Sequence, residues 1–313
     1  MNAAAHRIAV LIPCFNEAIT ISDVIGNYRQ ALPEADIYVY DNNSSDDTVQ
    51  CAQNAGAIVR QEYLQGKGHV VRRMFRDINA DWYVMVDGDN TYNANIAPEM
   101  LRIAMTGSYD LVNCVRREVG QEAYRGGHRF GNWLLTKVVC KVFGRPVRDM
   151  LSGYKVFSRR FVKSFPALSG GFNIETELTV HALELNIPVA YVEGDYRGRI
   201  PGSVSKLNTY RDGFRILRFI VALIKHERPL LLFLSCAVVL AFASLTLGVP
   251  VVLQYLHTGM VPRFPTAILA MGIMLLAFLS LTTGIILDTV TRGRKEMRML
   301  AYLQTAAFIK SNQ

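Results

Sequence analysis

The chain contains 313 residues, of which half are hydrophobic, and carries a formal net charge of +8. This length suits one large domain or two ordinary ones, and the positive charge favours an anionic partner such as nucleic acid, anionic lipid or a phosphorylated substrate. The five cysteines have no Cys-x-x-Cys spacing, which argues against a zinc site and against a disulfide framework.

Short apolar runs alternate with amphipathic segments over the first ninety residues. Buried strands are predicted at 8–12, 37–40, 57–59 and 82–86, and helices at 21–32, from about 47, and from about 69 to 79. The first run is too short for a signal peptide. Strands that alternate with helices predict a parallel sheet covered on both faces, whose ligands bind beyond the carboxyl ends of the strands. The polar loops that follow these strands are expected at that edge.

Two aspartates close the last of these strands in the sequence Asp87-Gly88-Asp89. Side chains two positions apart at a strand end lie on the same side, so their carboxylates are expected to converge. Close carboxylates repel each other unless a cation lies between them, and oxygen ligands suit Mg²⁺ or Mn²⁺. The motif therefore predicts a metal that holds a nucleotide diphosphate, and a polar surface turn is the alternative interpretation.

The loop after the first strand excludes two common nucleotide-binding classes. It has the sequence Pro13-Cys14-Phe15-Asn16-Glu17, where a dinucleotide-binding domain would carry G-x-G-x-x-G. The chain also has no Walker A sequence, which excludes an ordinary P-loop ATPase.

Four polar motifs occur in order: Ile12-Pro-Cys-Phe-Asn-Glu17, Asp41-Asn-Asn-Ser-Ser-Asp-Asp-Thr48, Gly66-Lys-Gly68 and Asp87-Gly-Asp89. Together they resemble the ordered motifs of family 2 glycosyltransferases with the GT-A fold. The resemblance implies an α/β, Rossmann-like GT-A catalytic domain with a mostly parallel sheet. The pair Asn42-Asn43 departs from the family, in which Asp-Gly is commoner, so the identity of the nucleotide base stays open.

The same resemblance assigns roles to individual residues. It implies that the nucleotide sugar is bound by Pro13, Phe15, Glu17, Asp41, Lys67 and Asp87. It also implies that Asp89, together with Asp87, binds the metal.

Further motifs resemble the polyprenyl-phosphate branch of this family, to which dolichol-phosphate mannose synthase belongs. Asp149-Met-Leu-Ser-Gly-Tyr-Lys155 resembles a segment whose aspartate lies at the acceptor side, which implies a catalytic or positioning role for Asp149. The alternatives are a helix cap and an ion pair with Arg148. The acceptor phosphate is expected to be bound by Arg117, Arg129, Arg199 and Lys206. Glu175 and Glu177 open a helix, where the helix dipole alone explains them.

Two long uncharged runs, 230–256 and 264–287, follow the predicted catalytic domain. Each is long enough to cross a hydrocarbon core of about 30 Å, and an amphipathic segment precedes them. Lysine and arginine number six over 206–228, five over 288–310 and one between the runs, which predicts cytoplasmic flanks. The expected organisation is a glycosyltransferase domain at 1–207, a juxtamembrane amphipathic helix at 208–228, a two-helix transmembrane anchor at 229–290 and a cytoplasmic tail at 291–313.

These features predict an inverting transfer of one sugar from a nucleotide-diphosphate sugar to a polyprenyl phosphate at the cytoplasmic face of a membrane. UDP is favoured over GDP, and Mg²⁺ or Mn²⁺ is the expected cofactor. A processive polysaccharide synthase is one alternative, but Trp82 and Trp133 do not lie in its Gln-x-x-Arg-Trp motif. A non-catalytic, membrane-anchored nucleotide-binding subunit is another, and the intact aspartates argue against it. Nucleic acid is not an expected partner, because much of the basic charge flanks the apolar runs. A small homo-oligomer is left open.

Overall fold

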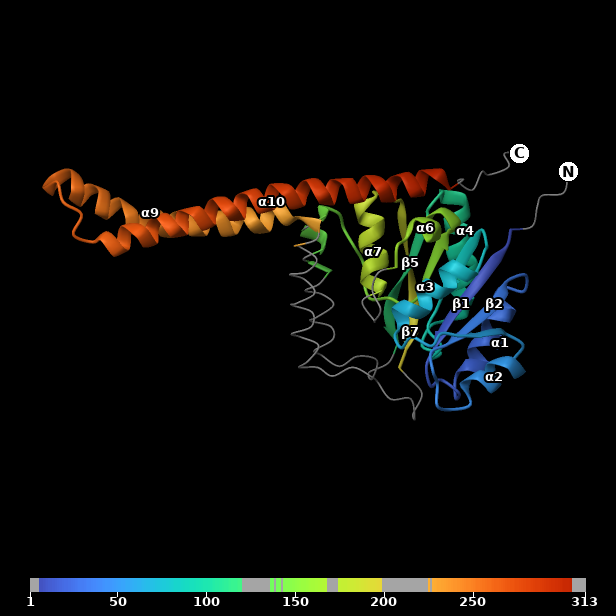
Figure 1. Ribbon diagram of the computed structural model, residues 1–313. Helices are drawn as coiled ribbons and strands as arrows, with labels where there is room; N and C mark the ends of the chain where they lie inside the picture. Colours follow the sequence, from blue (N-terminus) through green and yellow to red (C-terminus); the bar gives the residue numbers. More distant parts are fainter. Residues whose placement is uncertain are drawn as a thin grey trace. The chain divides into compact units, whose positions relative to one another are not determined.

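The computed structural model describes residues 6–119, 136–137, 139–141, 143–167, 174–198, 225 and 227–305. The chain divides into two compact units, Met1–Gly213 together with Arg298–Gln313, and Phe214–Met297, which are described separately. The first unit (Figure 1) contains β1 (Ile8–Cys14), α1 (Ile21–Ala31), β2 (Asp36–Asp41), α2 (Thr48–Asn54), β3 (Ile58–Gln61), α3 (Lys67–Asp77), β4 (Trp82–Met85), η1 (Ala94–Ile96), α4 (Ala97–Gly107), β5 (Leu111–Val119), β6 (Lys155–Ser158), α6 (Arg159–Ser164), α7 (Ile174–Glu184) and β7 (Val189–Arg197). The second unit contains α9 (Pro229–Thr258) and most of α10 (Phe264–Gln304).

A seven-stranded sheet forms the centre of the first unit, in the order β3-β2-β1-β4-β6-β5-β7. Neighbours among β1 to β4 are parallel, β5 is parallel to β7, and β6 is antiparallel to both of its neighbours. The prediction of an α/β domain with a mostly parallel sheet is therefore confirmed, with one reversed strand. Because β6 is reversed, its amino end lies at the same edge as the carboxyl ends of β4 and β5. The loop that leads into β6 is thereby delivered to the edge where the polar loops end.

Successive side chains of β1 point to opposite faces of the sheet, and both faces are covered, which explains why the first apolar run has no polar residues. Val10 and Ile12 pack into a core with α1, α2 and α4, whereas Ala9 and Leu11 pack into a second core with α3, α6 and α7. All four side chains are buried. A central parallel strand that is covered on both faces needs apolar residues at every position, and this is what the sequence supplies.

The last turns of α10 belong to the first unit. The Tyr302 hydroxyl donates to Oδ2 of the buried Asp110 at 2.7 Å. The same carboxylate accepts from Ser158 Oγ at 2.6 Å and from two nitrogens of Arg160, whose guanidinium lies over the Tyr302 ring. The helix α10 thus ends at Gln304, within the segment 291–313 that was predicted as a cytoplasmic tail.

We expect Tyr302→Phe to lower the melting temperature of the protein in detergent by about 3–10 °C. A hydrogen bond to a buried charged group contributes about 1.5–3 kcal/mol, and a domain of this size loses a few degrees for each kcal/mol. Tyr255→Phe is the control, because Tyr255 is exposed on α9. Equal melting temperatures for the two variants would show that the Tyr302 contact does not stabilise the first unit.

Small residues let α9 and α10 pack closely. Ser244 Oγ donates to the carbonyl oxygen of Ala270 at 2.6 Å, and Ser280 Oγ donates to that of Phe233 at 2.9 Å. A Cβ at Gly284 would lie 2.9 Å from the Cβ of Phe233, so only glycine permits the approach there. Small residues and side-chain hydrogen bonds of this kind are typical of helices that pack within lipid.

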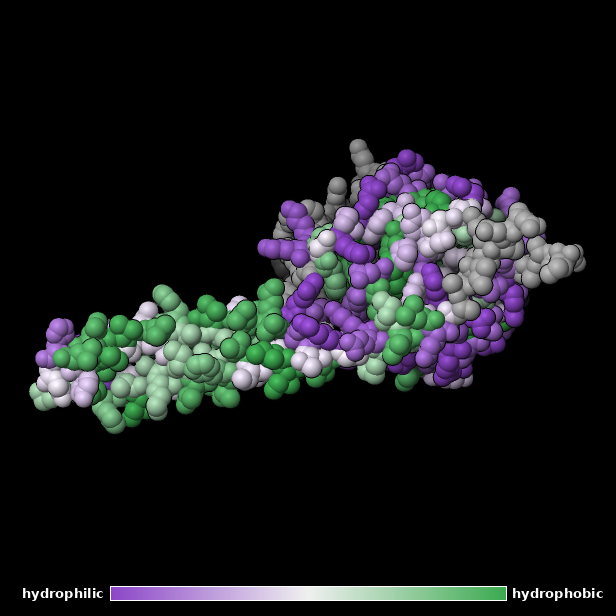
Figure 2. Space-filling view, turned by 90° about the horizontal axis from the view of Figure 1, so that it is seen from above, coloured by the Kyte–Doolittle hydropathy of each residue, from purple (hydrophilic) through white to green (hydrophobic). Residues whose placement is uncertain are grey.

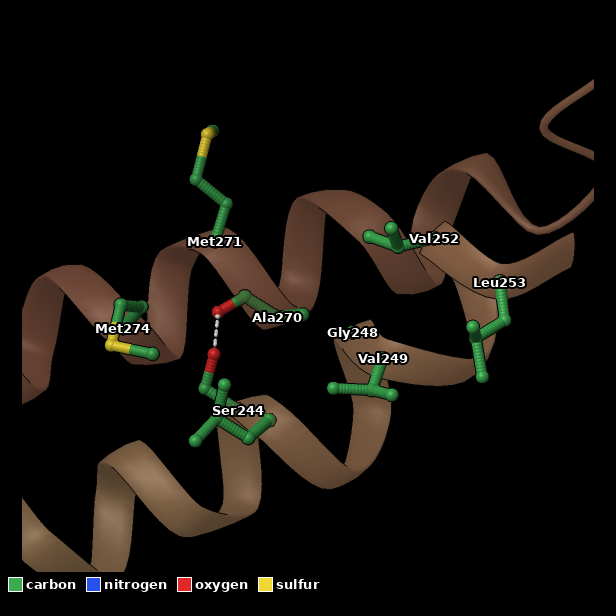
Figure 3. A pocket seen from close by; sticks show the side chains of 9 residues that line it. Ser244, Gly248, Val249, Val252, Leu253, Ala270, Met271 and Met274 are labelled. Carbon is green, nitrogen blue, oxygen red and sulfur yellow. Dashed lines mark hydrogen bonds between the residues drawn. The ribbon is translucent and has the colours of Figure 1, made fainter. Parts of the chain in front are cut away.

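Hydrophobic side chains cover the outer surface of these two helices (Figure 2). Both helices are long and apolar enough to cross a membrane. An apolar groove of about 380 Å³ lies between them, where Ser244 and Ala270 are hydrogen-bonded beside Gly248, Val249 and Met271 (Figure 3). Two candidate spans were predicted, and the described part of the chain contains two helices of this kind. The amphipathic helix expected before them lies almost entirely outside the described residues.

Candidate active site

The loops that follow β1 and β2 are joined by hydrogen bonds. Asn16, with a φ of 54°, donates its backbone N–H to Ser44 Oγ at 2.8 Å, and its Oδ1 accepts from the N–H of Ser45 at 2.7 Å. The N–H of Glu17 donates to Thr48 Oγ1 at 2.9 Å. The first two motifs therefore form one continuous polar surface at the carboxyl edge of the sheet.

Asp41 ends β2 with a buried carboxylate. Its Oδ2 accepts from the N–H of Ser44 at 3.1 Å, whereas its Oδ1 has no hydrogen-bond partner in the part of the chain that the structure describes. Buried acceptors are nearly always satisfied, so this oxygen is suited to a donor on a bound ligand. Pro13, near the end of β1, and Phe15, just after it, are partly exposed.

Asn42, where the chain departs from the family pattern, connects the loop after β2 to the loop between β3 and α3. Its Nδ2 donates to the carbonyl oxygens of Glu62 and Leu64 at 2.9 and 2.8 Å, and its Oδ1 accepts from the N–H of Gly66 at 2.7 Å. An amide supplies both donors and an acceptor, which a carboxylate in its place could not. The departure therefore has a structural reason.

The buried thiol of Cys14 shows which carboxylates meet. Burial raises the pKa of Cys14 well above its ordinary value, and the negative charges of Glu17, Asp41, Asp87 and Asp89 raise it further. Electrostatic influence falls with distance, so these four carboxylates surround one residue at the end of β1. The structure thus brings together predicted site residues from the first, second and fourth motifs.

Lys67 begins α3 and connects the third motif to the fourth. Its Nζ donates to Asp87 Oδ1 and to Glu175 Oε1, each at 2.5 Å. Burial alone would lower the pKa of Lys67, but the two carboxylates outweigh burial and raise it above its ordinary value, so the side chain stays charged. The buried Glu175 comes from α7, and its place in the site was missed because the helix dipole seemed to explain it.

Asp89 is buried and accepts from the Thr91 hydroxyl at 2.7 Å. Between the two aspartates, a Cβ at Gly88 would lie only 2.8 Å from Cys14 Sγ. The described residues contain no group of three or more His, Cys, Asp or Glu side chains that could hold a metal by themselves. Mg²⁺ and Mn²⁺ are usually bound by one or two carboxylates and completed by water and substrate phosphate. The pair Asp87 and Asp89 therefore fits such a metal.

The loop before β6 packs directly on Asp87. A Cβ at Gly153 would collide with the Asp87 carboxylate, so glycine permits this contact. The N–H of Gly153 donates to the Tyr92 hydroxyl at 2.8 Å. The Asp149 loop, as the segment from Asp149 to Gly153 is called below, and the Asp-x-Asp motif therefore share one site.

Asp149 forms a bidentate ion pair with Arg116. Arg116 Nε and Nη2 each donate to the carboxylate at 2.7 Å, and the Arg116 N–H donates at 3.0 Å. Burial alone would raise the pKa of Asp149, but these contacts outweigh it and hold the pKa below its ordinary value. The alternative partner, Arg148, instead contacts Glu193 at 3.2 Å. Asp149 is therefore ionised and fixed in orientation.

Of the four basic residues expected at the acceptor side, the structure describes Arg117. It is exposed and pairs with Asp195, its register partner on β7, at 2.6 Å. Arg129, Arg199 and Lys206 lie outside the described residues. Successive side chains of a strand point to opposite faces, so Arg116 and Arg117 lie on opposite faces of β5. This alternation could have predicted from the sequence that only one of the two arginines reaches Asp149.

Comparison with known proteins gives consistent matches. The model of the family Glycosyl transferase family 2 matches residues 9–165. Over 308 residues the chain is 32% identical to the glycosyltransferase AglJ of Haloferax volcanii, covering 95% of this chain and 98% of that protein. It is 54% identical over 154 residues to an uncharacterized protein of Shigella flexneri, covering 49% of this chain and 94% of the relative. It is 23% identical over 206 residues to the undecaprenyl-phosphate mannosyltransferase of Micrococcus luteus, covering 60% and 84%.

Solved structures match the fold. Glucosyl-3-phosphoglycerate synthase of Mycobacterium tuberculosis, in complex with Mn²⁺, UDP-glucose and phosphoglyceric acid, matches with a TM-score of 0.58 at 22% identity, over 72% of this chain and 80% of that chain. Two proteins of such low identity share an architecture, and this likeness extends no further.

Proposed function

The chain belongs to glycosyl transferase family 2, and we propose that within this family it transfers one sugar from a UDP-sugar to a polyprenyl phosphate, with inversion at the anomeric carbon. The observation that carries the proposal is the contact of the Asp149 loop with Asp87, because it supports a single site in which donor and acceptor would meet. The two apolar helices and the undecaprenyl-phosphate mannosyltransferase among the relatives support a lipid acceptor.

The donor half would be built by the first four motifs. Asp41 Oδ1, buried without a partner in the described chain, is suited to accept from the base or ribose. Asp87 and Asp89 would hold a divalent metal, for which the mycobacterial structure with Mn²⁺ and UDP-glucose is the precedent. When bound, the metal supplies positive charge to the leaving diphosphate. Lys67 balances the charge of Asp87 before the donor arrives.

The acceptor half would need little base catalysis. The second pKa of a phosphate monoester is near 6, so the acceptor is largely dianionic at neutral pH and its oxygen can attack directly. Asp149 is ionised and forms an ion pair with Arg116. It would position the sugar and the acceptor on the side opposite the leaving group. Attack from that side inverts the anomeric carbon.

The membrane segments would bring the acceptor to the site. Lysine and arginine are more numerous in the segments that flank the two spans than in the turn between them. This distribution supports a catalytic domain and both termini on the cytoplasmic side. A lipid-linked phosphate diffuses in the plane of the bilayer, so an anchored domain meets it at a fixed height. The amphipathic segment at 208–228 would lie along that surface.

A transfer assay with the full chain in detergent tests the function. Radiolabelled UDP-glucose, UDP-N-acetylglucosamine, UDP-galactose and GDP-mannose are each incubated with undecaprenyl phosphate and MnCl₂, with EDTA and with unphosphorylated undecaprenol as controls. We expect one UDP-sugar to give a lipid-extractable, acid-labile product that requires both the metal and the phosphate. Polymer formation would favour a processive synthase, and nucleotide binding without transfer would favour a non-catalytic subunit.

Neutralising one expected phosphate ligand separates the two substrates. We expect Arg129→Gln to raise the KM for the lipid acceptor by about tenfold, with a smaller change for the donor, because an arginine–phosphate contact contributes about 1.5 kcal/mol or more. Arg102→Gln, on the exposed face of α4, is the control. A larger increase in the donor KM would refute the assignment of Arg129 to the acceptor.

A further inference from the structure

A buried polar chain lies beneath the Asp149 loop. Lys155, the first residue of β6, is fully buried and donates from Nζ to Asn113 Oδ1. Asn113, its register partner on β5, donates from Nδ2 to the carbonyl oxygens of Arg148 and Asp149, each at 3.0 Å. The connection from Lys155 through Asn113 to Asp149 is called the Lys155 relay below.

The two ends of the relay determine which way the Asn113 amide faces. An ammonium group can only donate hydrogen bonds, and carbonyl oxygens can only accept them. The Asn113 amide therefore satisfies both neighbours in one orientation, with Oδ1 toward Lys155 and Nδ2 toward the loop. If the Lys155 ammonium were removed, reversing the Asn113 amide would no longer break a hydrogen bond to it. In the reversed orientation the carbonyl oxygens of Arg148 and Asp149 would lose their hydrogen-bond donor.

The loop needs this support because its backbone is strained at Asp149. The φ of Asp149 is +44°, in the left-handed region that a residue with a Cβ rarely adopts. The carbonyl oxygen of Asp149 is held by Asn113, and its carboxylate is held by Arg116. Two residues of β5 thus fix both the backbone and the side chain of Asp149, and Lys155 of β6 orients one of them.

We propose that Lys155 is a positioning residue for sugar transfer, which acts through Asn113 to hold the Asp149 loop in its reactive conformation. This role rests on the proposed function, in which Asp149 positions the acceptor and the sugar. Lys155 itself touches neither substrate, because it is fully buried under the loop.

The chemistry of Lys155 supports a role beyond filling space. A buried charge costs free energy unless it is paired, and methionine would fill nearly the same volume without that cost. Burial lowers the pKa of Lys155 to about 8, while the charges of Asp149 and Glu175 oppose the effect of burial and those of Arg116 and Lys67 add to it. The ammonium therefore persists at neutral pH.

Two substitutions interrupt the relay at different points. Lys155→Met removes the ammonium, and Asn113→Asp keeps the pairing with Lys155 but replaces the donors that face the loop carbonyls. We expect both to lower kcat by about ten- to a hundredfold, because small misplacements at a reacting centre have effects of this size. We expect the donor KM to change less than threefold, since no donor-side residue is touched.

Ser158→Ala is the matched control, because Ser158 lies on the same strand and its hydroxyl donates to the buried Asp110 away from the Asp149 loop. We expect it to lower the melting temperature at least as much as Lys155→Met while kcat stays within about twofold. If the control and the relay variants all lost kcat in proportion to their loss of melting temperature, the decrease in kcat would reflect general stability. The proposal would then be wrong.

Hydrogen–deuterium exchange keeps the test independent of the proposed function. We expect exchange across residues 147–154 to be about tenfold faster in both relay variants and unchanged in the control. If the parent protein fails to transfer sugar but the loop exchanges faster in both variants, the proposed function is refuted and the relay stands. Unchanged exchange and unchanged kcat in both relay variants would overturn the relay.

Discussion

Asp89→Asn is expected to lower kcat for sugar transfer by about a thousandfold. Asp89 is buried in the loop that follows β4, and it is one of the two carboxylates proposed to hold the divalent metal. Loss of a group that stabilises developing charge at the leaving diphosphate costs two to three orders of magnitude in comparable sites. The measurement is initial rate against Mn²⁺ concentration, in which the variant should also require much more metal for half-maximal rate.

The control for this substitution lies at the other end of the same strand. Asp81 directly precedes β4 and accepts from the Arg7 N–H at 3.0 Å. Asp81→Asn removes a carboxylate of the same kind from the opposite flank of β4, and we expect a rate within about twofold of the parent. An Asp89→Asn variant that retained both its rate and its metal requirement would refute the metal site.

Asp149→Asn is expected to lower kcat by about a hundredfold without moving the acid limb of the pH–rate profile. The amide cannot accept both guanidinium donors of Arg116 as the carboxylate does, so the positioned carboxyl group is lost. Because the pKa of Asp149 is held below its ordinary value, the residue is ionised throughout a practical assay range. The limb should instead follow the acceptor phosphate, with a midpoint near 6.

Arg148→Gln is the companion variant, because Arg148 was the alternative partner of Asp149 and is found with Glu193. Its rate should stay within about twofold of the parent. Near-normal turnover of Asp149→Asn would refute a role in transfer, and a displaced acid limb would identify Asp149 as the titrating base.

The placement of the first, second and fourth polar motifs could be predicted from the sequence because these motifs follow the ends of parallel strands. In a parallel sheet the loops after β1, β2 and β4 must share an edge, so topology alone places Asp41 and Asp87 at the same edge. Asn42 shows the limit of this reasoning. Its side chain bonds to three backbone groups of the loop between β3 and α3, and no pattern in one sequence identifies partners about twenty residues away.

The positions of Asp149 and Glu175 were harder to predict, because they depend on the direction of β6 and on which face of α7 packs against the site. The sequence does not show that β6 runs antiparallel, yet this reversal brings Asp149 to the site. Of the glutamates that open α7, tertiary packing turns Glu175 toward Lys67, a choice that the dipole argument could not make. The roles of Arg129, Arg199 and Lys206 stay predictions.

The two halves of the site come from consecutive stretches of chain. Loops up to Tyr92 would supply the nucleotide side in the proposed function, and β5 to β7 would supply the other, with Lys67–Glu175 and Asp87–Gly153 as the contacts that bridge them. A chimera that takes its first ninety-odd residues from a relative with another nucleotide preference should therefore exchange donors while keeping its lipid, provided that both bridging pairs are carried across the junction intact.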